Sequence, residues 1–301
     1  MTNRIPGKLI SPTKTKLEGR EPPVTDLMRA RAFWLLRRYT SLIYIERQYV
    51  LWTKVIEGLK NDAGRASDPY TIRWFMTVLG ELYRYQAAYE AGLDLLRQGD
   101  KSGYDSIVVG ADASTYLHSP TFDNDDYGWL ALGDEKKRPL VGILAWGRRA
   151  YTMARNTLTT LRAEWTYEKF QEPEFAEAES VFPKNLPPAP LPRPGALQCS
   201  PGDTVPTGGV WLPIDRRLGC FNYFMTEWEV PEAMSTVRHW AFPSDEDGPG
   251  DSGYIYERRP SRWELVWEDD RYAGGNIPEE LEYLSDDIKL PNEPLQLLPF
   301  P

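Results

Sequence analysis

The sequence predicts an α+β protein in which an N-terminal antiparallel helical bundle precedes a smaller, Trp-rich domain that contains β-strands. The first half holds long stretches with apolar residues spaced three and four apart, the pattern of amphipathic helices. A Pro-rich run then separates this half from short aromatic and β-branched runs bounded by Gly, Pro and Asp, which are typical of strands. The expected organisation is a flexible lead-in at 1–23, a helical bundle at 24–182, a connector at 183–207 and an acidic β-rich domain at 208–301.

Four main helices are expected in the bundle. Thr25 is a good N-cap for one long amphipathic helix that continues to about Lys60. Asp68-Pro69 starts a second helix that ends near Gln98, so that the two form a helical hairpin. A shorter helix is expected within 103–118, then a polar loop at 119–138, and a last helix from after Pro139 to about Phe170.

Eight prolines between 183 and 206 exclude a helix or a central strand, so this connector is expected to be extended. Leucines interleaved with these prolines could hold it along the bundle. Beyond it, strands are expected at 208–213, 220–225 and 263–267, where Trp263, Leu265 and Trp267 alternate with other residues. The run 231–237 is expected to form a helical turn.

Charge is distributed unevenly along the 301 residues, whose net charge is -9. Residues 1–207 carry 27 Lys+Arg against 25 Asp+Glu, a balance of +2, whereas residues 208–301 carry 8 against 19, a balance of -11. Such acidity argues against a nucleic-acid partner, because phosphate contacts need a basic surface. It favours a partner protein with a basic surface, since complementary fields accelerate encounter.

Composition also limits the compartment and the chemistry. The first residues lack the apolar core of a signal peptide, and no apolar run approaches the roughly 20 residues that span a bilayer. A cytoplasmic protein without a membrane partner is therefore expected. Two Cys and two His are too few for a disulfide framework or a zinc site. Asp123, Asp125 and Asp126 lack the Glu that completes a calcium loop, so neither a metal nor a cofactor is expected.

Carboxylates are the remaining candidates for catalysis, because nucleotide-binding glycine loops and the Gly-x-Ser-x-Gly motif are absent. Asp245-Glu246-Asp247 and Glu268-Asp269-Asp270 lie in the Trp-rich part. Paired acids beside Trp platforms would suit a carbohydrate-active enzyme or a carbohydrate-binding protein. The alternative for such residues is plainer: acids in solvated turns, and Trp side chains that fill a small core.

Three short motifs carry a resemblance: Thr207-Gly-Gly-Val-Trp-Leu-Pro213, Gly219-Cys-Phe-Asn-Tyr223 and Arg262-Trp-Glu-Leu-Val-Trp-Glu-Asp-Asp-Arg-Tyr272. Together with the layout of the chain they resemble bacterial polymorphic-toxin immunity proteins, most closely the immunity protein 71/72 group associated with Rhs and type VI secretion systems. The resemblance implies a cytoplasmic, non-enzymatic inhibitor that binds one cognate toxin domain. Such a protein occludes the toxin's active site or its substrate-binding surface.

Acidic residues with aromatic anchors are the predicted contacts with that toxin: Asp245, Glu246, Asp247, Trp263, Trp267, Glu268, Asp269 and Asp270. Two alternatives stay open beside the immunity protein, the carbohydrate-related function and a scaffold protein without a toxin. A third alternative concerns the interface alone, which could lie on the helical hairpin with its arginines at Arg37, Arg38, Arg73 and Arg84.

Overall fold

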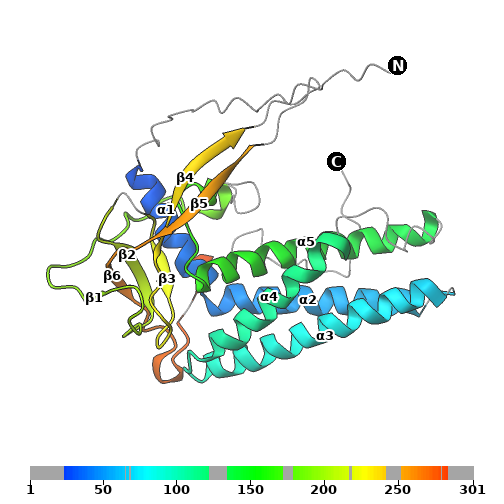
Figure 1. The fold of residues 1–301 in the computed structure, drawn as a ribbon. Coiled ribbons are helices and arrows are strands. Elements are labelled where there is room, and N and C mark those ends of the chain that lie inside the picture. Colours follow the sequence, from blue (N-terminus) through cyan, green and yellow to red (C-terminus); the bar gives the residue numbers. More distant parts are fainter. Residues whose placement is uncertain are drawn as a thin grey trace, which may run out of the picture.

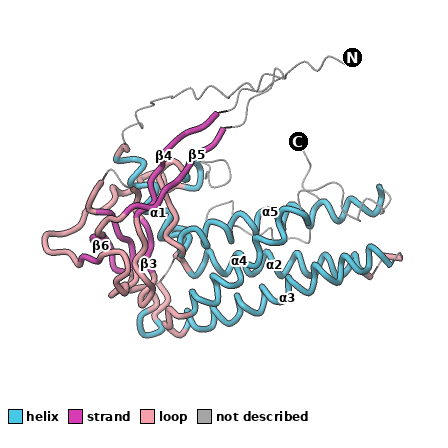
Figure 2. The backbone as a smooth tube through the Cα atoms, viewed as in Figure 1, coloured by secondary structure: helices cyan, strands magenta, loops and turns pink. Residues whose placement is uncertain are grey.

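The computed structural model describes residues 24–64, 66–67, 69–121, 134–171, 179–216, 219–241, 252–278 and 280–283. Helices occupy the first half of the chain and two small antiparallel sheets the second, which confirms the α+β class (Figure 1). The strands and loops gather at one end of the long helices (Figure 2). The predicted lead-in at 1–23 lies outside the described residues.

The helices are α1 (Asp26–Tyr39), α2 (Leu42–Ala63), α3 (Pro69–Arg97), α4 (Gly103–Thr121) and α5 (Asp134–Leu161). α2 and α3 form the predicted hairpin, α4 packs beside α3, and α5 lies against both α2 and α4. Figure 1 shows α3 along the outer side of this bundle and α1 at the end near the sheet. The bundle is therefore built as predicted, with the exceptions that follow.

The prediction of one helix from Thr25 to Lys60 was wrong, because the chain breaks between α1 and α2. At the break, the Ser41 side chain accepts a hydrogen bond from the backbone N–H of Tyr44 and so caps α2. The Thr40 hydroxyl donates to the carbonyl of Leu36, 2.8 Å away, within the last turn of α1. Hydroxyl side chains thus end one helix and start the next without Gly or Pro.

The bounds of the last helix also differ from the prediction. α5 begins at Asp134, before Pro139, and ends at Leu161 rather than near Phe170. Just beyond its end Ala163 has a positive φ of 55°, a conformation that stops an α-helix. The polar loop was predicted too long, since α4 reaches Thr121 and residues 122–133 lie outside the description.

The three predicted strand runs are confirmed as β2 (Gly209–Pro213), β3 (Asn222–Phe224) and β6 (Trp263–Glu268). With the short β1 (Gln198–Cys199) they form an antiparallel sheet in the order β1-β6-β2-β3. β4 (Ala233–Ala241) and β5 (Ser252–Arg259) form a separate antiparallel pair. The helical turn predicted at 231–237 was wrong, because β-branched Thr236 and Val237 lie in β4, which is paired to β5.

The connector contains no helix or strand between residues 183 and 197, as its prolines require. Of its interleaved leucines, Leu186 packs against the core whereas Leu191 and Leu197 are exposed. One apolar core cluster continues from the helices into the sheet, and it includes Trp34, Leu82 and Tyr104 from the bundle with Val210 and Phe221 from the β region. The domain boundaries stay a prediction, but this core is shared across them.

Candidate interaction surface

A buried ionic cluster lies where β6 ends and meets the helices. We use this name for Asp269, Arg271, Tyr272 and Glu280. Arg271 donates from Nε and a terminal nitrogen to the two carboxylate oxygens of Asp269, at 2.8 and 2.9 Å. Tyr223 of β3 donates its hydroxyl to the same carboxylate at 2.8 Å. Charge-assisted, bidentate pairing of this kind is the arrangement that a buried carboxylate needs.

The same arginine links the cluster to the break between α1 and α2. Arg271 donates to the backbone carbonyl of Arg37 at 2.9 Å and to the hydroxyl of Thr40 at 2.8 Å. Tyr104 of α4 donates to the carbonyl of Thr40 at 2.7 Å. The carbonyl groups of Arg37 and Thr40, at the end of α1, thus accept hydrogen bonds from side chains of other elements.

The start of α2 is capped from the same side. The backbone N–H of Leu42 donates to the hydroxyl oxygen of Tyr272 at 2.7 Å, and that of Ile43 donates to Glu280 at 3.0 Å. Tyr272 in turn donates its own proton to Glu280. A carboxylate at a helix N-terminus is favoured by the helix dipole. The Glu280 contact therefore stabilises both the break between α1 and α2 and the C-terminal segment that supplies Glu280.

The two buried carboxylates respond oppositely to their surroundings. Burial alone would raise the pKa of Asp269, but the Arg271 guanidinium beside it, with Lys101 and the Tyr223 hydroxyl, brings the pKa below its ordinary value. For Glu280 burial prevails and raises the pKa, although Tyr272, Arg271 and the Ile43 N–H oppose the shift. Asp269 therefore keeps its negative charge to a lower pH than Glu280 does.

Two of the predicted toxin contacts lie in the interior. Trp263 is 1% exposed and donates its indole N–H to the carbonyl of Pro231 at 2.9 Å. Asp269 is 3% exposed and is held by Arg271. In this conformation neither side chain reaches a partner, because β6 turns them toward the core.

The other described candidates are accessible. Glu268 and Asp270 are exposed on either side of Asp269, since alternate residues of an extended chain face opposite ways. Trp267 is half-buried: Phe33 contacts it edge-on, and the guanidinium of Arg37 lies 5.2 Å from its ring. Asp245, Glu246 and Asp247 lie outside the described residues, as do Asp123, Asp125 and Asp126.

An acidic edge forms at this end of the sheet, a name we give to Asp105, Glu227, Glu268 and Asp270. All four are exposed. The indole N–H of half-exposed Trp228 donates to Asp105 of α4 at 2.9 Å, which places Glu227 beside the α3–α4 turn.

Contacts around Gly208 bring Glu268 and Asp270, at the end of β6, close to the segment that contains Glu227. The carbonyl of Gly208, next to Thr226, accepts a hydrogen bond from the Asp269 N–H at 2.9 Å. The Thr207 hydroxyl donates to Glu268 at 2.9 Å. The sequence prediction missed Trp228 with its flanking acids Glu227 and Glu229, although this triplet is visible in the chain.

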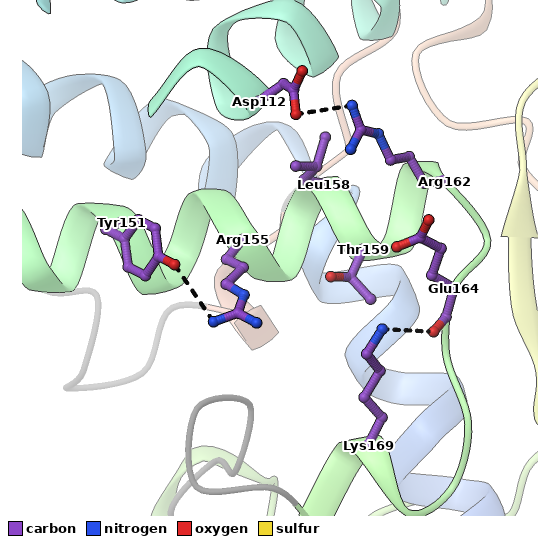
Figure 3. A pocket seen from close by; sticks show the side chains of 8 residues that line it. All are labelled: Asp112, Tyr151, Arg155, Leu158, Thr159, Arg162, Glu164 and Lys169. Carbon is purple, nitrogen blue, oxygen red and sulfur yellow. Dashed lines mark hydrogen bonds and ion pairs between the residues drawn. The ribbon is translucent and has the colours of Figure 1, made fainter. Parts of the chain in front are cut away.

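A second surface feature is a cleft that is lined by cations as well as acids. A polar cleft of about 350 Å³ lies between α5 and the segment that follows it, and Figure 3 shows its lining: Asp112, Tyr151, Arg155, Leu158, Thr159, Arg162, Glu164 and Lys169.

The cations of the cleft have partners within it. Arg162 pairs with Asp112 at 2.9 Å, and Lys169 donates to the Glu164 carbonyl at 3.2 Å. Arg155 donates to the Tyr151 hydroxyl at 3.4 Å. These contacts form a surface network of hydrogen bonds and one ion pair rather than a nucleophile with its base.

Reactive groups are limited in the described part of the chain. Cys199 and Cys220 are both buried, and burial raises the pKa of the Cys199 thiol to about 12. Among the described residues no group of three or more His, Cys, Asp or Glu is arranged to hold a metal ion. Across the same residues no helix is both long and apolar enough to cross a bilayer.

Comparison with known proteins gives one match. Residues 190–285 match the family model described as immunity protein 72. No curated protein and no solved structure matches the chain. The matched stretch contains the four-stranded sheet, three of the four acidic edge residues (Glu227, Glu268 and Asp270) and the buried ionic cluster. Over residues 190–285 the chain is thus similar to immunity protein 72, which confirms the resemblance to the immunity proteins of polymorphic toxins.

Proposed function

We propose that this protein neutralises a cognate antibacterial toxin domain by binding it and covering its active site or substrate-binding surface. The match of residues 190–285 to immunity protein 72 is the observation that carries the proposal. The toxin would belong to an Rhs or type VI secretion effector, and the complex would form in the cytoplasm. Occlusion needs no catalysis, so the proposal assigns the protein no enzymatic activity and no cofactor.

The acidic edge is the surface that we assign to the toxin. Its four carboxylates are exposed, whereas the neighbouring Asp269 is neutralised inside the protein. Toxins that act on nucleic acids or nucleotides need basic clefts, and an acidic surface competes for such a cleft through charge. Trp228 is half-exposed beside this edge and would anchor the contact, because aromatic side chains often contribute most to binding energy. Trp267 is also half-exposed, but it packs against Phe33 of α1.

Charge reversal on this edge tests the proposal. The ligand would be the cognate toxin domain, for which the reading frame directly upstream of this chain is the first to test, purified in a catalytically inactive form. Exchanging Glu268 and Asp270 together for Lys should slow association several-fold at low salt and much less at high salt, because exposed charges act over a screened range. The matched control exchanges Glu57 of α2 and Asp94 of α3, both exposed acids of the helices, for Lys.

The outcomes distinguish the two candidate toxin-binding surfaces, the acidic edge and the helical hairpin. Slower association of the Glu268/Asp270 variant with an unchanged control supports the acidic edge. An unchanged rate at every salt concentration would move the interface to the helical hairpin. If the unaltered protein fails to bind the toxin domain or to protect cells that express the active toxin, the immunity function itself is refuted.

The carbohydrate alternative gains no support from this geometry. A sugar platform needs an exposed Trp face beside an acid pair that is free to exchange protons. Trp263 is buried and hydrogen-bonded, and Asp269 is tied to Arg271. We therefore propose toxin binding alone.

A further inference from the structure

The connector ahead of β1 contains a polyproline arm, a name that we give to residues 186–194. Every residue in this range is either a proline or precedes one. Proline fixes its own φ at about −65° and confines the residue before it to extended conformations. Both preferences are met by the polyproline II conformation, which repeats every three residues without internal hydrogen bonds. In the described part of the chain, no backbone group from Leu186 to Pro192 makes a hydrogen bond, as that conformation requires.

Burial along the arm follows the same three-residue period. Leu186, Ala189 and Pro192 are half-buried, and the first two pack against the hydrophobic core. The two residues that follow each of them are exposed. One side of the arm is therefore held by the protein, while its other two sides face outward.

The far end of the arm is fixed as well. The backbone N–H of Ala196 donates to the carbonyl of Arg193 at 2.9 Å, and Gly195 between them has a φ of 76°, as a type II turn requires. The chain then enters β1, the edge strand of its sheet (Figure 1), and the carbonyl of Leu197 accepts from the N–H of Leu265 at 2.9 Å. A segment that is already held in one conformation loses little entropy when a partner binds it.

The two outward sides of the arm are two rows of exposed residues. Three residues per turn place Pro187, Pro190 and Arg193 in one row and Pro188, Leu191 and Pro194 in the next. Leu191 is 69% exposed, the largest fraction among the exposed large apolar side chains of the described residues. The arm thus presents two apolar ridges, and a cation stands at the end of one of them.

The arm is cationic, although the β-rich part of the chain that follows it is acidic. Residues 180–202 contain Lys184 and Arg193 but no Asp or Glu, a balance of +2, whereas residues 208–301 have a balance of -11. Both cations are exposed, and among the described residues neither side chain has an ion pair or a hydrogen bond. An exposed guanidinium at a fixed position is available to a carboxylate of another molecule.

We propose that the polyproline arm is a docking site for a protein groove that is lined by aromatic rings and has carboxylates at one end. Segments in the polyproline II conformation bind grooves of this kind, because flat rings pack against the apolar ridges and the conformation is already formed. The open backbone carbonyls of the arm accept hydrogen bonds from the groove. The carboxylates pair with Arg193 and set the direction in which the arm lies.

The arm is separate from the acidic edge that we assign to the toxin. β1, which follows the arm, pairs with β6 through Gln198 and Glu264 near the start of β6, whereas Glu268 and Asp270 lie at its end. The toxin surface is proposed to be basic, and a basic surface repels Arg193. We therefore assign the arm to a second partner, which can bind while the acidic edge is occupied.

Isothermal titration calorimetry of the full chain against a purified polyproline-binding domain tests this docking site. The probe domain has an aromatic groove with carboxylates at one end, and in a matched control domain those carboxylates are exchanged for amides. We expect a one-to-one complex with the probe and about tenfold weaker binding of the amide form, because the amides remove the partner of Arg193. An unaltered chain that does not bind the probe overturns the proposal.

Two exposed positions of the arm should control this binding in different ways. Arg193→Glu should weaken binding of the carboxylate probe about tenfold and of the amide form much less, because only the first contains the opposing charge. Leu191→Ser should weaken binding of both domains, since it removes an apolar contact. Arg73→Glu on α3 and Leu197→Ser beyond the turn change exposed residues outside the arm and should leave binding unchanged.

The remaining outcomes are equally decisive. Arm variants that bind like the unaltered chain, or controls that weaken binding as much as the arm variants do, refute the docking site. Self-association of the chain that Arg193→Glu abolishes, or a loss of toxin binding in the arm variants, would assign the arm to another occupant and also overturn the proposal. Circular dichroism of each variant verifies that the fold is intact.

Discussion

Replacing Asp269 by Asn is the sharpest test of how the two halves of the chain are connected. The substitution keeps the shape of the side chain but removes the charge that faces Arg271. That carboxylate accepts from Arg271 at 2.8 and 2.9 Å and from Tyr223 at 2.8 Å. Arg271 is 8% exposed and would stay charged in the interior.

The expected loss of stability follows from the weakened pairing of this guanidinium. Breaking a buried ion pair from one side costs about 3–5 kcal/mol, and we expect the lower part of that range because Glu280, 3.5 Å from Arg271, remains as a counter-ion. Small domains are stable by roughly 5–15 kcal/mol, so this loss is a large share of the total. Exchanging Arg271 for Met as well gives a double-mutant cycle for the pair. The double variant should lose less stability than the two single losses added together, because each single variant already breaks the ion pair.

Urea unfolding measures the effect with two signals, far-ultraviolet circular dichroism for the helices and intrinsic fluorescence for the 11 Trp residues, which lie in both halves of the chain. Because Arg271 also binds the α1–α2 junction, both signals should shift together to lower urea. Asp270→Asn, at the exposed neighbour, should stay within about 0.5 kcal/mol of the unaltered protein. A loss below about 1 kcal/mol for Asp269→Asn, or a shift confined to the fluorescence, would refute the reasoning.

The remaining predictions concern pH, a turn and the thiols. Asp269 has a folded-state pKa below its ordinary 3.8, so its contribution to the free energy of unfolding is complete above pH 3.8 and is lost as the pH falls through the lower folded value. The stability difference between the unaltered protein and Asp269→Asn should therefore narrow below pH 3.8. A constant difference would contradict the assignment. Gly99→Ala should destabilise the protein by more than about 1 kcal/mol in urea unfolding. The reason is that φ is +84° at Gly99 and the new Cβ would clash with the Tyr272 carbonyl oxygen. A neutral effect would show that the turn relaxes. Cys199 and Cys220 should resist a thiol reagent in the folded state and react only after denaturation, and rapid labelling of either would show that it becomes accessible.

Local patterns predicted most of the elements. The apolar spacing and the final Gly99 indicate α3, and its bounds at Pro69 and Arg97 agree with the prediction. Alternation around Trp263 and Trp267 likewise indicates β6. These features depend on residues within one or two turns or along one strand, so a single sequence contains them. The family resemblance also rested on short local motifs, and the match at 190–285 confirms it.

The acidic run at the end of β6 shows what local patterns leave open. Glu268, Asp269 and Asp270 are chemically similar neighbours, and the sequence assigned all three to a toxin contact. Alternation alone separates the middle residue from the outer two, but it does not say which side faces inward. That choice depends on Arg271 and Tyr223, which give Asp269 a counter-ion and a hydroxyl in the interior.

The sequence by itself determined the helical spacing, the strand runs, the proline connector and the acidity of the last third. Tertiary structure decided where the first helix breaks: Ser41 caps α2 locally, but two further groups at its N-terminus come from the far end of the chain. Tyr272 binds Leu42 across 230 positions and Glu280 binds Ile43 across 237. Helix propensity between Thr25 and Lys60 favours continuity, and hydrogen bonds from distant side chains outweigh it. Contacts over such separations form only once the chain is folded, so no local window of the sequence contains them.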